Sequence, residues 1–69
     1  MFNYILTKIN TRRIEKQISQ QYMAGQLKIS QGYYNKLENG KSEMTLRMVF
    51  RIAEILEVHP EELFRRYSK

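Results

Sequence analysis

The sequence predicts an all-α fold, a compact single domain of five helices covering residues 1–69. Two observations carry this prediction: apolar residues recur at helical spacing, and helix-capping residues separate the periodic segments. Runs of β-branched residues are absent, and only one proline and three glycines interrupt the 69 residues. Because a chain of this length buries only a modest core, we expect one domain.

Residues 19–41 predict two short helices joined by a tight turn. Ser19 is a good N-cap for a helix over Gln20–Leu27, and Ser30 is a good N-cap for a helix over Gln31–Asn39. The turn and stop residues of this pair are Lys28, Ile29 and Gly40. Apolar side chains on each helix share a face, so the two helices can pack together: Met23, Ala24, Leu27, Ile29, Tyr34 and Leu37.

Three further helices complete the predicted fold. The first is expected over Asn3–Lys16, the fourth over Leu46–Leu56 after a Thr45 cap, and the fifth opens at Pro60. Acidic residues in the first turn of the fifth helix and basic residues in its last turn suit the helix dipole: Glu61, Glu62, Arg65 and Arg66.

The fourth helix carries the widest apolar stripe, which should face the core: Leu46, Val49, Phe50, Ile52, Ala53 and Leu56. Met48 and Ile55 lie outside this stripe, and we expect them on the surface. Leu63 and Phe64 of the fifth helix are expected to point inward.

Arg13 falls on or beside the apolar face of the first helix. A buried charge needs a partner, and Glu38 in the third helix is the candidate. The alternative is that Arg13 lies exposed at the helix edge.

The net positive charge of the chain comes entirely from residues 1–41. Residues 1–41 hold seven basic and two acidic residues, a net +5, whereas residues 42–69 hold five of each, a net zero. This asymmetry is typical of a nucleic-acid binder, although a solvated basic face without a ligand has the same composition.

Several classes of function find no support in the sequence. There is no cysteine for a disulfide or thiolate metal site, and no apolar run approaches the length of a membrane span. No signal peptide is evident, so a cytoplasmic protein is expected. The lone histidine, His59, suits a weak N-cap better than a catalyst, so we expect no enzyme activity, no metal, no cofactor and no small-molecule ligand.

The outer face of the third helix has the chemistry of a DNA-reading surface. It is polar and free of acidic residues: Gln31, Gly32, Tyr33, Asn35 and Lys36. A glutamine amide suits adenine, and a lysine ammonium can donate to guanine. Helix-start polarity without any ligand is the alternative for Gln20 and Gln31.

Taken together, the chain resembles the lambda-repressor/Cro-like (XRE-type) helix-turn-helix family over roughly Ile5–Phe64. The residues that carry this resemblance are Arg13, Ile18, Ser19, Gln20, Met23, Ala24, Leu27, Ile29, Ser30, Gln31, Leu37, Glu38, Asn39, Gly40, Lys41, Leu46, Ile52, Ala53, Leu56, Val58, Glu62, Leu63 and Phe64. The resemblance implies a lambda-repressor-like five-helix domain, with the helix-turn-helix at about 19–39, whose third helix enters the major groove of double-stranded DNA.

Site residues follow from the resemblance and from the chemistry above. The predicted base-reading residues are Gln31, Gly32, Lys36 and Asn35. The predicted phosphate-contacting residues are Gln20, Tyr33, Asn39, Lys41, Arg12 and Arg13. The resemblance further implies that Gln20 braces the third helix and that Arg13 pairs with Glu38.

The chain also departs from the family pattern. Gln17 and Lys28 stand where the family prefers glycine, and a non-glycine residue in a left-handed conformation costs on the order of 1 kcal/mol. Gly25 lies inside the second helix, so we expect that helix to be less stable than usual or its turn to be altered. Tyr34 occupies a position where many members have isoleucine or valine, and its buried hydroxyl would need a partner or a route to solvent.

Specificity against a genome favours two copies, so we expect a homodimer on an inverted-repeat operator, acting as a repressor. Since the fifth helix lies near the end of the sequence, the domain itself should supply the dimer interface: Met48, Ile55, Val58, Phe64 and Tyr67. The main alternative is an antitoxin-like protein-interaction module with DNA binding secondary. A basic first helix lying on a membrane is a third possibility.

Overall fold

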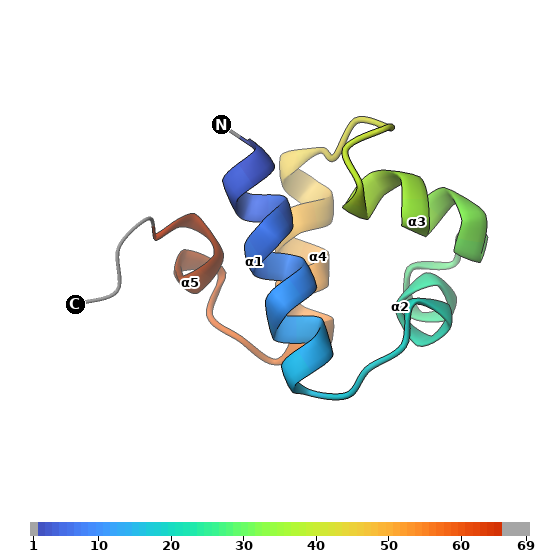
Figure 1. The fold of residues 1–69 in the computed structure, drawn as a ribbon. Helices are drawn as coiled ribbons and strands as arrows, with labels where there is room; N and C mark the ends of the chain where they lie inside the picture. The colour runs from blue at the N-terminus through green and yellow to red at the C-terminus, as the bar shows by residue number, and fades with distance from the viewer. Residues whose placement is uncertain (1, 66–69) are drawn as a thin grey trace.

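A computed structural model describes residues 2–65, which contain five helices and no strand (Figure 1). The helices are α1 (Phe2–Glu15), α2 (Gln20–Leu27), α3 (Gln31–Glu38), α4 (Leu46–Leu56) and α5 (Pro60–Phe64). The all-α prediction is confirmed, and the bounds of α2 and α4 are as predicted. Helix α1 begins and ends one residue earlier than predicted, and α3 ends one residue earlier, with Asn39 as its C-cap.

Helices α1 and α4 lie at the centre of the molecule. The pair α2 and α3 packs on one side of them, and α5 packs on the other (Figure 1). Helix α3 therefore lies at one end of the molecule, where its outer surface is open.

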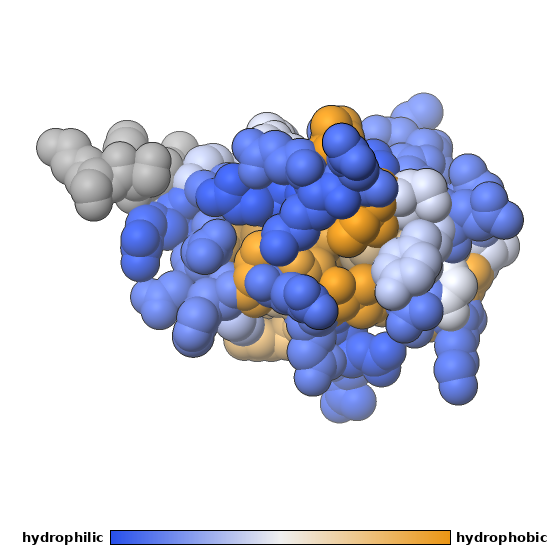
Figure 2. Space-filling view, turned by 90° about the horizontal axis from the view of Figure 1, so that it is seen from below, coloured by the Kyte–Doolittle hydropathy of each residue, from blue (hydrophilic) through white to orange (hydrophobic). Residues whose placement is uncertain are grey.

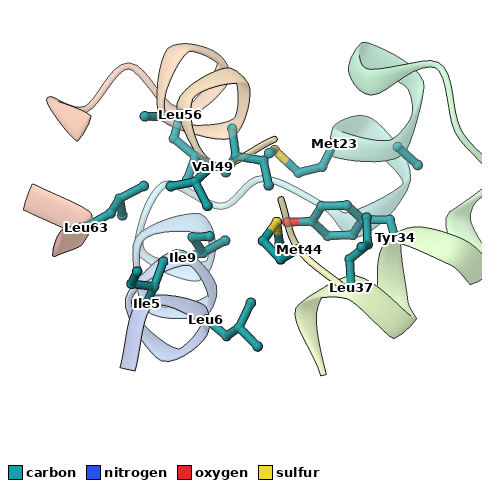
Figure 3. Close-up of a cluster of buried hydrophobic side chains, with 13 residues drawn as sticks. Ile5, Leu6, Ile9, Met23, Tyr34, Leu37, Met44, Val49, Leu56 and Leu63 are labelled. Carbon is teal, nitrogen blue, oxygen red and sulfur yellow. The ribbon is translucent and has the colours of Figure 1, made fainter. Parts of the chain in front are cut away.

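The core joins buried apolar side chains from all five helices and from the loop that follows α3 (Figure 3). Its members are Ile5, Leu6, Ile9, Met23, Ala24, Tyr34, Leu37, Met44, Val49, Ile52, Ala53, Leu56 and Leu63. The predicted facing surfaces of α2 and α3 are confirmed, since Met23, Tyr34 and Leu37 are fully buried.

Three apolar residues were wrongly assigned to the core. Leu46, Phe50 and Phe64 are 53%, 47% and 38% exposed. The apolar stripe of α4 is wider than the surface that α1, α2 and α5 cover, so its Leu46–Phe50 edge stays open. Conversely, Met48 and Ile55 are partly buried against the core rather than outside it.

Hydroxyl side chains cap the three central helices, as predicted. Ser19 and Ser30 accept from the backbone N–H groups of Tyr22 and Tyr33 at 2.9 and 3.1 Å, and Thr45 accepts from that of Met48 at 3.2 Å. His59 occupies the N-cap position of α5 but makes no side-chain cap hydrogen bond. Arg65 is the C-cap of α5, and Arg66 lies outside the described residues.

The ends of α1 and α2 keep the left-handed turn despite lacking glycine. Gln17 and Lys28 have φ of 59° and 61°. The backbone N–H groups of the next residues, Ile18 and Ile29, donate back to carbonyls five residues earlier, each at 3.0 Å. The turn after α2 is thus unaltered, and each non-glycine residue there costs on the order of 1 kcal/mol.

Replacing Gly25 by alanine should stabilise the domain. Gly25 lies within α2, and a Cβ built there meets nothing within 4 Å. We expect Gly25→Ala to raise the free energy of unfolding by about 0.5–1 kcal/mol, and thermal denaturation should show a melting temperature higher by several degrees.

Gly40→Ala is the opposing control. Gly40 has φ +77°, and an added Cβ would lie 3.4 Å from Cδ1 of Leu6. This variant should melt at a lower temperature than the wild type. Equal destabilisation by both substitutions would contradict this account of the two glycines.

Candidate nucleic-acid interface

Helix α3 separates a buried face from an exposed face. Tyr34, Leu37 and Glu38 are buried, and the outward residues are all exposed: Gln31, Gly32, Tyr33, Asn35 and Lys36. This exposed set is the one that the sequence predicted to face DNA. The helix thus presents hydrogen-bonding side chains and one cation on a surface without a carboxylate.

A buried carboxylate holds α3 from behind. Glu38 has a side chain only 1% exposed, and it accepts five hydrogen bonds. Arg13 donates through Nε and Nη2 at 2.9 and 3.1 Å, and Tyr34 donates its hydroxyl at 2.8 Å. Asn10 and Gln20 each donate a side-chain amide at 3.0 Å. These five residues, the Glu38 network, join α1, α2 and α3.

The predicted Arg13–Glu38 pair is confirmed, and its charges are well compensated. The remaining terminal nitrogen of Arg13, Nη1, donates to the backbone carbonyl of Ile18 at 2.8 Å. Among the described residues, no buried side-chain nitrogen or oxygen is left without a partner. Such compensation is what a buried ion pair needs to offset its loss of hydration.

The network shifts the pKa values of its members in opposite directions. Burial raises the pKa of Glu38, but the hydrogen bonds from Arg13, Gln20, Tyr34 and Asn10 outweigh it, so the net pKa is lowered. The hydrogen bond to Glu38 raises the pKa of Arg13. Burial, followed by the hydrogen bond to Glu38, raises the pKa of Tyr34. Glu38 is therefore ionised, and Tyr34 protonated, at neutral pH.

Gln20 links this network to the exposed face of α3. Its Oε1 accepts from Asn35 Nδ2 at 3.2 Å, and Asn35 Oδ1 accepts from Asn39 Nδ2 at 3.1 Å. The contact by which Gln20 braces α3 is therefore present. Lys41 lies beyond, exposed in the loop that follows Gly40.

The structure does not bring Arg12 or Arg13 to this surface. Arg13 is committed to Glu38, with its side chain 11% exposed. Arg12 pairs with Glu15 at 2.9 Å and with Glu62 of α5 at 3.4 Å, on the side of α1 that faces away from α3. Their predicted role as phosphate contacts finds no support in this placement.

The sequence analysis did not include Asn10 in the Glu38 network, and it did not name Glu38 as the partner of Tyr34 or Gln20. Asn10 precedes Arg13 by three residues and so shares its helix face, which was the available signal. The partner that the Tyr34 hydroxyl required is Glu38, four residues further along the same helix.

Other kinds of site are not evident in residues 2–65. No cluster of three or more histidine, acidic or cysteine side chains there could hold a metal ion. No described helix is both long enough and apolar enough to cross a bilayer. The apolar face of α1 is buried in the core through Ile5, Leu6 and Ile9, so it is not available to lie on a membrane.

The structure describes four of the five predicted dimer residues, and among these four only Phe64 is exposed. Met48, Ile55 and Val58 are partly buried against the core, and Tyr67 lies outside the described residues. The Phe64 ring instead contacts Phe50, with centroids 6.0 Å apart. These two rings and Leu46 form an exposed apolar area over α4 and α5, which we call the α4–α5 patch.

Hydrophobic side chains also gather on the lower face of the molecule, between α5 and α2 (Figure 2). Ile14 near the end of α1 is 59% exposed, and Tyr22 of α2 is 52% exposed. Tyr22 also borders an open pocket with Gln17, Ile18, Ser19 and Glu57.

Removing the charge of Glu38 should destabilise the fold and flatten its acid dependence. Because its folded pKa is lowered, Glu38 contributes stability above its unfolded value of about 4.3, and that stability is lost as the pH falls. Glu38→Gln leaves Arg13 unpaired, so we expect a loss of about 3–5 kcal/mol, measured by urea denaturation between pH 3 and 8.

Glu43→Gln, at an exposed residue, is the matched control and should change little. Tyr34→Phe tests the network more gently and should lose about 1–3 kcal/mol. Similar stability of Glu38→Gln and Glu43→Gln at pH 7 would contradict the role of the network.

Comparison with known proteins agrees with this geometry. A family model described as helix-turn-helix matches residues 9–63, which is most of the chain. No curated protein matches the chain. No solved structure matches it either. The family match supports a DNA-binding transcription regulator, and the chain belongs to the helix-turn-helix family of the lambda-repressor/Cro-like (XRE) type.

Proposed function

We propose that this protein is a homodimeric transcriptional repressor that binds double-stranded DNA in a sequence-specific manner, with α3 in the major groove. The observation that carries the proposal is the outer face of α3, which is exposed, acid-free and held from behind by the Glu38 network. Such a protein works where the genome is, so we propose a cytoplasmic location. No part of the proposed activity requires a cofactor.

The base-reading residues in this proposal are Gln31, Gly32, Lys36 and Asn35, all exposed on one helix face. Gln31 has a donor and an acceptor in one plane, as adenine N7 and N6 require, and Lys36 can donate to guanine O6 and N7. Gly32 has no Cβ, and nothing lies within 4 Å of where one would be, so the helix can approach the groove closely.

The phosphate-contacting residues surround this face: Gln20, Tyr33, Asn39 and Lys41. The amides at the start of α2 favour a phosphate by themselves, because they carry the positive end of the helix dipole. We leave Arg12 and Arg13 out of this set, since both are paired within the protein.

A second copy would double the base contacts of a single short helix. The Cα trace extends 35 × 23 × 18 Å, so two protomers side by side can place their α3 helices about one helical turn of DNA apart, about 34–36 Å. We propose the α4–α5 patch as the dimer surface, since Leu46, Phe50 and Phe64 are its exposed apolar residues. Basic and acidic side chains border it, including Arg47, Arg51 and Glu54, which suits an isologous contact.

The alternative function is a protein-interaction module with DNA binding secondary, as in an antitoxin-like partner. The observations that favour it are the hydrophobic side chains that gather on the lower face (Figure 2) and the exposure of Ile14 and Tyr22. Under this alternative, removing the Lys36 charge from α3 would leave binding to the partner protein intact. That result would separate the two functions.

Selection from a random duplex library at near-physiological salt tests DNA reading. We expect an inverted repeat with half-sites about one turn apart. On that sequence Gln31→Ala and Lys36→Ala should each lose about 1–3 kcal/mol of discrimination at one base pair, because each removes one base contact.

Gln26→Ala and Lys16→Ala are the matched controls, because they make the same chemical changes at exposed residues away from the outer face of α3. Equal affinities for all four variants would contradict base reading by α3. Recovery of no enriched sequence would leave only salt-dependent backbone binding and would favour the protein-interaction module.

Polar substitution in the α4–α5 patch should weaken the dimer. We expect Phe50→Ser to shift the monomer–dimer equilibrium toward monomer by at least about tenfold, because a buried aromatic hot spot at an interface contributes about 2 kcal/mol or more. Sedimentation equilibrium measures this shift. Ile14→Ser, at an exposed residue outside the α4–α5 patch, is the control and should leave the equilibrium unchanged. An equal effect of the two substitutions would contradict the α4–α5 patch as the dimer surface.

A further inference from the structure

Three side-chain amides form a hydrogen-bonded row from the buried core to the outer face of α3. Gln20 Nε2 donates to Glu38 Oε1 at 3.0 Å, Asn35 Nδ2 donates to Gln20 Oε1 at 3.2 Å, and Asn39 Nδ2 donates to Asn35 Oδ1 at 3.1 Å. We call Gln20, Asn35 and Asn39 the amide chain. The amide chain starts from Glu38, whose side chain is 1% exposed, and it ends at Asn35 and Asn39, which are exposed.

Chemistry fixes the direction of every bond in the amide chain. An ionised carboxylate only accepts, so Gln20 must turn its nitrogen toward Glu38 and its oxygen toward Asn35. Asn35 must then turn its nitrogen toward Gln20 and its oxygen toward Asn39. Rotating the Asn35 amide by 180° would set oxygen against oxygen at Gln20, whose own orientation Glu38 fixes. A free surface asparagine has no such restriction.

From this geometry we infer that Glu38 and Gln20 are positioning residues for base recognition, because they lock the polarity of the Asn35 amide. Asn35 keeps one N–H hydrogen, on the side of α2, and one oxygen lone pair, on the side of the C-terminal end of α3. This order fits a base edge with an acceptor toward α2 and a donor toward the end of α3. Adenine N7 and N6 present that order in one strand orientation only.

The inference rests on the proposed function and adds a property to it. A locked amide distinguishes an A·T pair from the reversed T·A pair, because only one orientation meets both groups. An amide free to rotate can offer its groups in either order and discriminates less. The Asn35 position should therefore show a strong orientation preference that depends on residues that touch no base.

Library selection with the full-length protein tests this. Asn35→Ala first identifies the base pair, as the position in the half-site whose preference disappears. In the wild type that position should favour one orientation by about fivefold or more. Gln20→Met keeps the side-chain length and removes the amide, and it should reduce the preference there to less than about twofold. Other positions should keep their preferences.

Lys41→Ala is the matched control, because it removes a proposed phosphate contact outside the amide chain. It should lower affinity on all sequences and leave the preference at the Asn35 position intact. Gln20→Ala also removes the amide that fixes Asn35, so it provides a second test if Gln20→Met fails to fold. Thermal denaturation of each variant checks folding.

The outcomes separate the inference from the proposed function. If the Asn35 position keeps its orientation preference in Gln20→Met, or in Gln20→Ala where Gln20→Met does not fold, only the inference is overturned. If Asn35→Ala leaves the preference unchanged at every position of the motif, only the inference is overturned. Loss of the orientation preference in Lys41→Ala also overturns only the inference. A wild-type selection that enriches no sequence overturns the proposed function and the inference with it.

Discussion

The desolvation of one carboxylate governs this structure. Glu38 is almost fully buried, and a buried charge without partners would cost more than a small domain can tolerate. Its five hydrogen bonds come from three helices, so α1, α2 and α3 must meet in one arrangement for all of them to form. A purely apolar contact at this point would tolerate sliding and rotation, whereas directional bonds do not.

The burial of Glu38 also links the stability of the fold to the proposed recognition of DNA by α3. The side of α3 that holds Glu38 and Tyr34 is buried, and the opposite side is exposed to solvent. Gln20 belongs to both regions, since its nitrogen serves the buried carboxylate and its oxygen serves an exposed asparagine. The position of the recognition surface is therefore set by the interior.

Local sequence rules predicted most of the fold. Ser19, Ser30 and Thr45 mark three helix starts with cap hydrogen bonds, and helical spacing identified most of the core. Spacing failed for Leu46 and Phe50, because periodicity shows which face is apolar but not how much of it neighbouring helices cover. The hydrogen bonds of Gln20 to Asn35 and Glu38 were also missed, since contacts between residues that lie 15 and 18 positions apart depend on tertiary packing.

The most direct test of the account is ¹⁵N NMR of the full-length protein titrated with a mixed-sequence duplex at low salt. The account predicts that the largest backbone shift changes fall at the outer face of α3 and the start of α2, including Gln31, Gly32 and Gln20. Smaller changes are expected over the α4–α5 patch. Shift changes confined to residues around Ile14 and Tyr22, with the outer face of α3 unaffected, would contradict the account.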